Sequence, residues 1–212
     1  MPMRRRPAAR LLGTLLFVGS VLHAADSRAA AADAAGSAAG GAGAAAAAGP
    51  LAAEGLATMP IHGNQGVTVA VPLSAPVREA LARAAAAPAG AAPAVRLSVE
   101  GIEPPAAATP PVGVRVFLDA PRADAATPID DPHYVGSFTF FDGRAGSGGA
   151  AAKTAFLLDL GHTLRALGSP ERWLRRGDAA VTLVAVPLRR GESVEAVSIP
   201  FEKVRISLHP RP

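Results

Sequence analysis

The side chains best suited to holding a metal ion are four histidines that occur singly along the chain. After residue 29 they are His62, His133, His162 and His209. Ligands on one helix face or across one tight turn lie a few residues apart, and no pair here has that spacing. The pattern favours surface or hydrogen-bonding histidines over a metal site. A mononuclear metal site assembled from distant segments stays open as an alternative.

Hydrolytic chemistry has no matching motif either. A serine nucleophile elbow has the pattern Gly-x-Ser-x-Gly, and Ser147 lacks the first glycine. The run Asp130-Asp131-Pro132-His133 offers carboxylates for a calcium or acid–base site. However, aspartate before proline is typical of a turn, and residues 119–131 contain no Asp-x-Asp-x-Asp loop. We therefore predict a turn.

One basic and aromatic cluster remains, in which Trp173 lies among three arginines, Arg172, Arg175 and Arg176. A solvated face anchored by a buried tryptophan is the favoured interpretation, ahead of a ligand platform. An enzyme with an unrecognised site is the least favoured hypothesis, because no spacing brings polar residues together. We predict no catalytic residue, no metal ligand and no cofactor.

Composition excludes further classes of function. The chain has no cysteine, which removes disulfides, thiolate metal sites, cysteine nucleophiles and a lipidated N-terminal cysteine. Five of the 21 Lys and Arg, but only one of the 17 Asp and Glu, lie in residues 1–29. The rest of the chain is therefore balanced in charge and lacks the basic surplus that nucleic-acid binding requires.

The N-terminal part has the pattern of an export signal followed by a spacer. In residues 1–29 a cationic stretch precedes the apolar run Leu11–Leu22, and small residues follow. That run of about 12 residues is shorter than the roughly 20 that span a bilayer, so no transmembrane span is expected after cleavage. Residues 30–62 are rich in Ala and Gly, and we predict a disordered linker there. The expected location is periplasmic or extracellular.

From residue 63 to 209 short alternating segments predict an all-β fold. Val95, Leu97 and Val99 alternate with polar residues, as in a strand with one wet face. Strands are expected at 66–71, 94–100, 112–118, 134–141, 156–160, 181–187, 194–199 and 201–208, with short helices at 77–87 and 163–167. Seven or eight strands with little helix indicate an antiparallel β-sandwich or barrel.

Three stretches carry a family resemblance. They are Val114–Leu118, Asp130–Phe141, and Phe156–Leu160 with Leu164–Gly168. Their order and separation resemble the C-terminal β-sandwich domain that follows the copper domain in bacterial tyrosinases and polyphenol oxidases. The resemblance covers about residues 64–208.

This resemblance implies a function through binding. Family members hold two copper ions with six histidines on a helical bundle, which this sequence lacks, while their C-terminal domain covers the copper site. By analogy we expect a non-catalytic exported domain that binds or shields a separate type-3 copper oxidase as an accessory or assembly subunit. Tyr134, Phe140 and Phe141 are candidate partner contacts, with core packing as the alternative. A stand-alone structural or glycan-binding envelope module is the second hypothesis, which an exposed row of aromatics would favour.

Overall fold

The structure is a computed structural model that describes residues 50–88, 91–105, 110–140, 153–168 and 171–210. The chain divides into two units, Met1–Ala44 and Ala45–Pro212. The described residues all belong to the second unit. The predicted signal at 1–29 and the first 20 residues of the predicted linker lie outside them.

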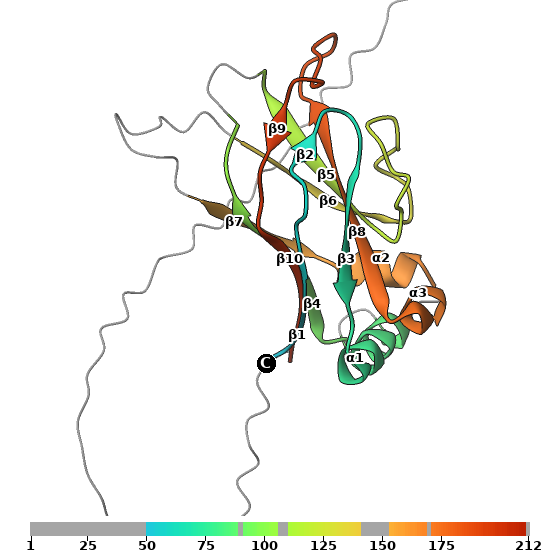
Figure 1. The fold of residues 1–212 in the computed structure, drawn as a ribbon. Helices are drawn as coiled ribbons and strands as arrows, with labels where there is room; N and C mark the ends of the chain where they lie inside the picture. Colours follow the sequence, from blue (N-terminus) through green and yellow to red (C-terminus); the bar gives the residue numbers. More distant parts are fainter. Residues whose placement is uncertain (1–49, 89–90, 106–109, 141–152, 169–170, 211–212) are drawn as a thin grey trace, which may run out of the picture. The chain divides into compact units, whose positions relative to one another are not determined.

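Two four-stranded antiparallel sheets form the body of this unit (Figure 1). The first sheet has the order β1 (Leu51–Leu56), β10 (Lys203–His209), β4 (Ala94–Ile102) and β7 (Thr154–Asp159). The second sheet has the order β3 (Val67–Pro72), β8 (Asp178–Pro187), β5 (Val112–Leu118) and β6 (Tyr134–Thr139). A two-stranded ribbon pairs β2 (Ile61–His62) with β9 (Ser198–Ile199). The predicted all-β antiparallel sandwich is confirmed.

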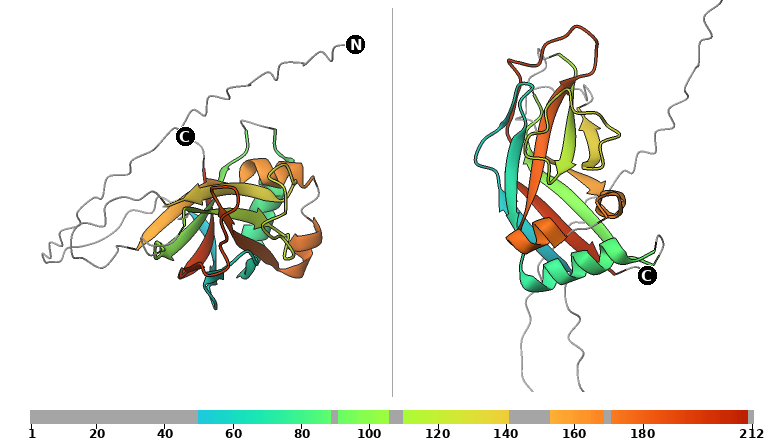
Figure 2. Two further views of the ribbon diagram at one scale, coloured as in Figure 1. Left: turned by 90° about the horizontal axis from the view of Figure 1, so that it is seen from above. Right: turned by 90° about the vertical axis from the view of Figure 1, so that its right-hand side faces the viewer.

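Three helices lie together at one end of the two sheets (Figures 1 and 2). They are α1 (Ala75–Ala86), α2 (Gly161–Ala166) and α3 (Glu171–Arg176). Pro76 lies in the first turn of α1, where a missing N–H costs no helical hydrogen bond. The buried face of the helix consists of Val77, Ala80, Leu81 and Ala84. The expected helices at 77–87 and 163–167 match α1 and α2 within two residues at each end.

The core lies between the two sheets, where their inward side chains meet. Val95, Leu97 and Val99 on β4 are buried as the alternation predicts. In the register of β4 with β10, Leu97 is opposite Ile206 and Val99 is opposite Val204. Burial of these aliphatic pairs supplies the main driving force for joining the sheets.

The second sheet is buried on both faces at β5 and β8. On its outer face, Phe117, Val184 and Val186 are buried together with Ala123 from the connection between β5 and β6. The Arg115 guanidinium donates hydrogen bonds to the carbonyls of Ala125 and Thr127, at 3.3 and 2.9 Å. This connection, predicted as a turn-rich loop, therefore covers the sheet.

The predicted boundary at residue 63 is wrong, because the sandwich already begins at β1. Leu51–Leu56 pairs with β10 over its full length, although its alanines and glycine lack the bulk that signals a strand. Small residues are needed there: a Cβ added at Gly55 would lie 2.5 Å from the carbonyl oxygen of Ala70 on β3. The linker predicted for 30–62 is therefore wrong for residues 51–62.

The predicted strand at 194–199 is also wrong over most of its length. Only Ser198 and Ile199 are extended and paired, as β9. The amide of Val197 donates to the carbonyl of Val194 at 2.9 Å, which closes a turn. Both valines are buried. The apolar pattern that predicted a strand here therefore comes from a turn in which both valines face inward. Across the described residues, no helix is long and apolar enough to cross a membrane.

Candidate functional site

The edge where β6 and β7 meet is built around three phenylalanine rings. Phe138 on β6 stacks on Phe156 of β7 with ring centroids 4.2 Å apart and an angle of 11°. Phe140 packs edge-on against both rings, at 5.9 and 5.8 Å. We call Phe138, Phe140 and Phe156 the aromatic edge. Phe138 is buried, while the other two rings are half-buried, so the cluster reaches the surface.

The predicted contact residues occupy different surroundings. Phe140 belongs to the aromatic edge, whereas Tyr134, at the opposite end of β6, packs edge-on against Phe117 with centroids 5.6 Å apart. Tyr134 is half-buried, and its carbonyl accepts a hydrogen bond from the hydroxyl of Thr163 at 2.8 Å. Phe141 lies outside the described residues. The structure therefore places Tyr134 and Phe140 in separate ring clusters, each partly open to solvent.

The three stretches that carry the family resemblance form one contiguous unit. β5 pairs with β6, with Val114 opposite Phe138. β6 meets β7 through the Phe138–Phe156 stack, and α2 is joined to β6 by Thr163. Segments that are separate in the sequence are thus neighbours in the fold.

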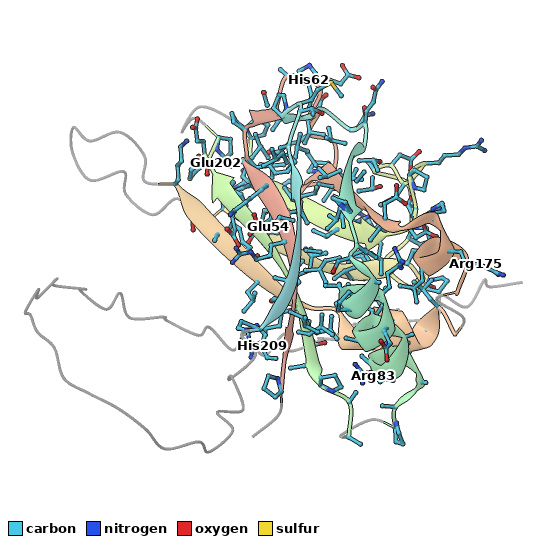
Figure 3. All side chains as sticks on the ribbon, turned by 60° about the horizontal axis from the view of Figure 1, so that its bottom comes forward. Glu54, His62, Arg83, Arg175, Glu202 and His209 are labelled. Carbon is cyan, nitrogen blue, oxygen red and sulfur yellow. The ribbon has the colours of Figure 1, made fainter. Side chains whose placement is uncertain are left out.

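Among the described residues, no three side chains of His, Asp or Glu are placed together to hold a metal ion. His62 donates to the carbonyl of Val197 at 3.1 Å, and His133 donates to that of Leu118 at 2.7 Å. His62 and His209 lie at opposite ends of the described unit (Figure 3). His62 and His133 therefore each bind a backbone carbonyl, and the two contacts lie in different parts of the fold.

The segment Asp130–His133 forms the predicted turn. The backbone amide of His133 donates to the Asp131 carboxylate at 2.8 Å, and the amide of Tyr134 donates to the Asp131 carbonyl at 2.9 Å. This is an Asx turn, which uses Asp131 for backbone geometry.

In the arginine cluster, Arg176 pairs with Asp119 and, at 3.4 Å, with Asp178. The hydrogen bond with Asp119 raises the pKa of Arg176 above its ordinary value. The predicted burial of Trp173 lies outside what is described of that side chain. Arg176 thus ties α3 to the chain that leaves β5.

The outer face of the first sheet carries an ion-pair network. Glu54 on β1 pairs with Arg205 and, at 3.3 Å, with Lys203 on β10; Lys203 also contacts Glu100 on β4 at 3.4 Å. The Arg205 hydrogen bond is the largest cause of the lowered pKa of Glu54. Figure 3 shows Glu54 on this face. Among the aromatic side chains whose burial is described, none is exposed, so the row that would favour glycan binding is not found there.

A cavity of about 480 Å³ lies where β1, α1 and β10 come together. It is lined by Pro50, Leu51, Ala80, Arg83, Pro93, Leu208, His209 and Pro210. No sequence pattern predicts this site, since its lining comes from four separate segments and contains no motif. Of its lining residues, only His209 is among the candidate metal ligands of the sequence, where a surface or hydrogen-bonding histidine is the favoured interpretation.

The comparisons with known proteins give a likeness in fold. No protein-family model and no curated protein matches the sequence. Among solved structures, the chain is similar to a recombinantly expressed latent aurone synthase, a polyphenol oxidase. Sequence identity is 20%, the TM-score is 0.46, and the match covers 74% of this chain and 26% of that chain. For the latent aurone synthase from its natural source, identity is also 20% and the TM-score is 0.45, with the same coverage.

The chain thus spans about a quarter of the length of these polyphenol oxidases. Likeness at this level does not transfer an activity to this chain.

Proposed function

We propose that this chain is a non-catalytic, exported domain that binds a separate type-3 copper oxidase and shields it, as an accessory or assembly subunit. The observation that carries the proposal is the contiguity of the three resembling stretches. β5, β6, β7 and α2 form one unit held by strand pairing, the Phe138–Phe156 stack and the Thr163 hydrogen bond. A resemblance confined to scattered, unconnected segments would carry less weight.

The partner surface in this proposal is the β6 side of the sandwich. Phe140 and Tyr134 each pack against neighbouring rings and are half-buried, so both residues are ordered and partly accessible to solvent. Ordered aromatic side chains of this kind contribute strongly to protein interfaces, because they bury a large area at low entropic cost. The sequence pattern at 1–29 supports delivery of the chain outside the cytoplasm, where it would meet an exported oxidase.

Catechol oxidation by a type-3 copper oxidase from the same organism tests this proposal. The oxidase is assayed with increasing amounts of the purified chain, and the chain is also assayed alone, together with its copper content by mass spectrometry. We expect saturable inhibition of the oxidase, no oxidation by the chain alone and no stoichiometric copper. Stoichiometric copper in an active chain would overturn the non-catalytic role, and an unchanged oxidase rate would overturn shielding.

The F140A variant, which removes the half-buried ring, is expected to weaken the inhibition. The matched control is L56A, because Leu56 is a 75% exposed apolar residue at the end of β1, on the edge of the first sheet opposite β7. Both variants must keep the far-UV circular dichroism spectrum of the parent chain. Equal inhibition by F140A and the parent chain would exclude the β6 side as the contact surface.

A further inference from the structure

The cavity at the helical end of the sandwich has a mostly apolar wall and a fixed frame. The side chains of Leu51, Ala80 and Leu208 line it together with three prolines. Leu51 and Leu208 are register partners at the ends of β1 and β10, so strand pairing fixes their spacing. Leu51 is 37% exposed, which leaves apolar surface for a ligand to cover. The volume of about 480 Å³ falls within the range typical of small-molecule sites.

The lining of this cavity contains a positively charged side chain and no negatively charged one. Arg83, in the last turn of α1, supplies a guanidinium, and no carboxylate lines the cavity. Among the described residues, Arg83 makes no side-chain hydrogen bond or ion pair, in contrast to Arg176 and Arg205. An unpaired guanidinium beside an apolar wall is complementary to a carboxylate attached to an apolar body.

The second polar side chain of the lining is His209, at the end of β10. Its Nε2 is hydrogen-bonded to the Ser207 hydroxyl at 3.1 Å, which orients the ring. Its Nδ1 has no partner within the described part of the chain. Figure 3 shows Arg83 and His209 at the same end of the described unit. The imidazole therefore adds a second hydrogen-bonding group to the polar side of the cavity.

We propose that this cavity binds a small organic carboxylate with an aryl or alkyl body. The apolar body lies against Leu51, Ala80 and Leu208, and the carboxylate pairs with Arg83. The site is on the helical end, whereas the proposed oxidase contact is on β6. Binding there requires no oxidase, so this inference stands or falls separately from the proposed function.

The test is a ¹H–¹⁵N NMR titration of the purified chain with 4-phenylbutyrate, and with the uncharged 4-phenylbutanamide as the matched ligand. We expect saturable shifts at the amides of Ala80, Arg83, Leu208 and His209. A hydrogen bond to a charged group contributes enough for the carboxylate to bind about tenfold more tightly than the amide.

Variants assign that preference to one side chain. R83Q is expected to bind the two ligands equally, and R83K to keep part of the preference because it keeps the charge. R122Q, which changes an exposed arginine on the connection after β5, is expected to behave as the parent chain. Because the positive charge of Arg83 also stabilises the C-terminal end of α1, the melting temperature of each variant is measured alongside.

Three results would overturn the proposal. They are no saturation by either ligand up to about 10 mM, shifts confined to residues away from the cavity, or equal binding of acid and amide by the parent chain. The last would leave an apolar cavity without the anion specificity proposed here. A preference that survives R83Q in a folded chain would also remove Arg83 from the site.

Discussion

The ring of Phe138 on β6 stacks on the ring of Phe156 on β7, with centroids 4.2 Å apart. β6 is the edge of the second sheet and β7 is the edge of the first, so this stack joins the two sheets where no strand pairing connects them. The opposite edges, β1 and β3, approach through backbone at Gly55. One side of the sandwich is thus closed by small residues and the other by large aromatic ones.

Replacing Phe138 by alanine should destabilise the chain strongly. The side chain is 6% exposed, and its removal leaves a cavity beside Phe140 and Phe156, at a cost of about 3–5 kcal/mol. L157A on β7 is the control, because Leu157 is 55% exposed and such changes usually cost within about 0.5 kcal/mol. Urea unfolding followed by circular dichroism measures both, and similar losses in the two variants would contradict the closing role of the stack.

β1 can be tested through two adjacent alanines. Ala53 is 7% exposed and faces the core opposite Ile206, while Ala52 is exposed. A53D places an unpaired charge in the core and should cost about 3–5 kcal/mol, whereas A52D should be nearly neutral. Thermal unfolding of the two variants measures the difference. If A53D is as stable as A52D, β1 is not a strand of this sandwich.

The alternation of residue types predicted some elements well. β5 was predicted at its observed ends, because four valine and leucine residues alternate between Pro111 and the turn at Asp119. β4 was predicted for the same reason. Such strands can be predicted from the sequence because one face consists wholly of large apolar side chains.

Elements whose sequence is shaped by a close neighbour were not predicted. β1 is Leu-Ala-Ala-Glu-Gly-Leu, a composition typical of a linker, and only the nearness of β3 explains its small residues. The sequence did not predict that Phe117 belongs to a second apolar cluster, because part of that cluster comes from the loop after β5, which has no alternating pattern. The cavity was missed since Arg83 and His209 are distant in sequence and meet only in the fold.

Gly66 is expected to hold the β5–β6 connection against the second sheet. A Cβ at this position would lie 2.4 Å from the carbonyl oxygen of Ala123, a backbone atom that cannot move without shifting the loop. G66A should therefore cost about 1–3 kcal/mol and increase amide hydrogen exchange in residues 119–131.

The control for Gly66 is G113A. The nearest atom to a Cβ at Gly113 is the end of the Leu188 side chain, at 3.1 Å, and that side chain is free to move because it is half-exposed. G113A should cost less than G66A and leave the exchange of the loop unchanged. An unperturbed loop in G66A would show that the close approach does not matter.

Acid should reduce the contribution of Glu54 to the stability of the folded chain. Its pKa is lowered in the folded state, first by the hydrogen bond from Arg205. A lowered pKa contributes stability above the unfolded value, and this is lost as pH falls through the folded pKa. Between pH 6 and pH 3 the melting temperature of E54Q should therefore fall less than that of the parent chain. E79Q, on the exposed face of α1, is the control and should follow the parent.

Isothermal titration calorimetry measures whether this chain binds a type-3 copper oxidase through the β6 side, as proposed above. The chain is titrated into the copper-loaded oxidase of the same organism, with F140A and L56A in parallel. We expect saturable binding at one chain per oxidase, weakened by F140A and unchanged by L56A. Absence of heat and of complex at concentrations well above micromolar, with both proteins folded, would contradict it.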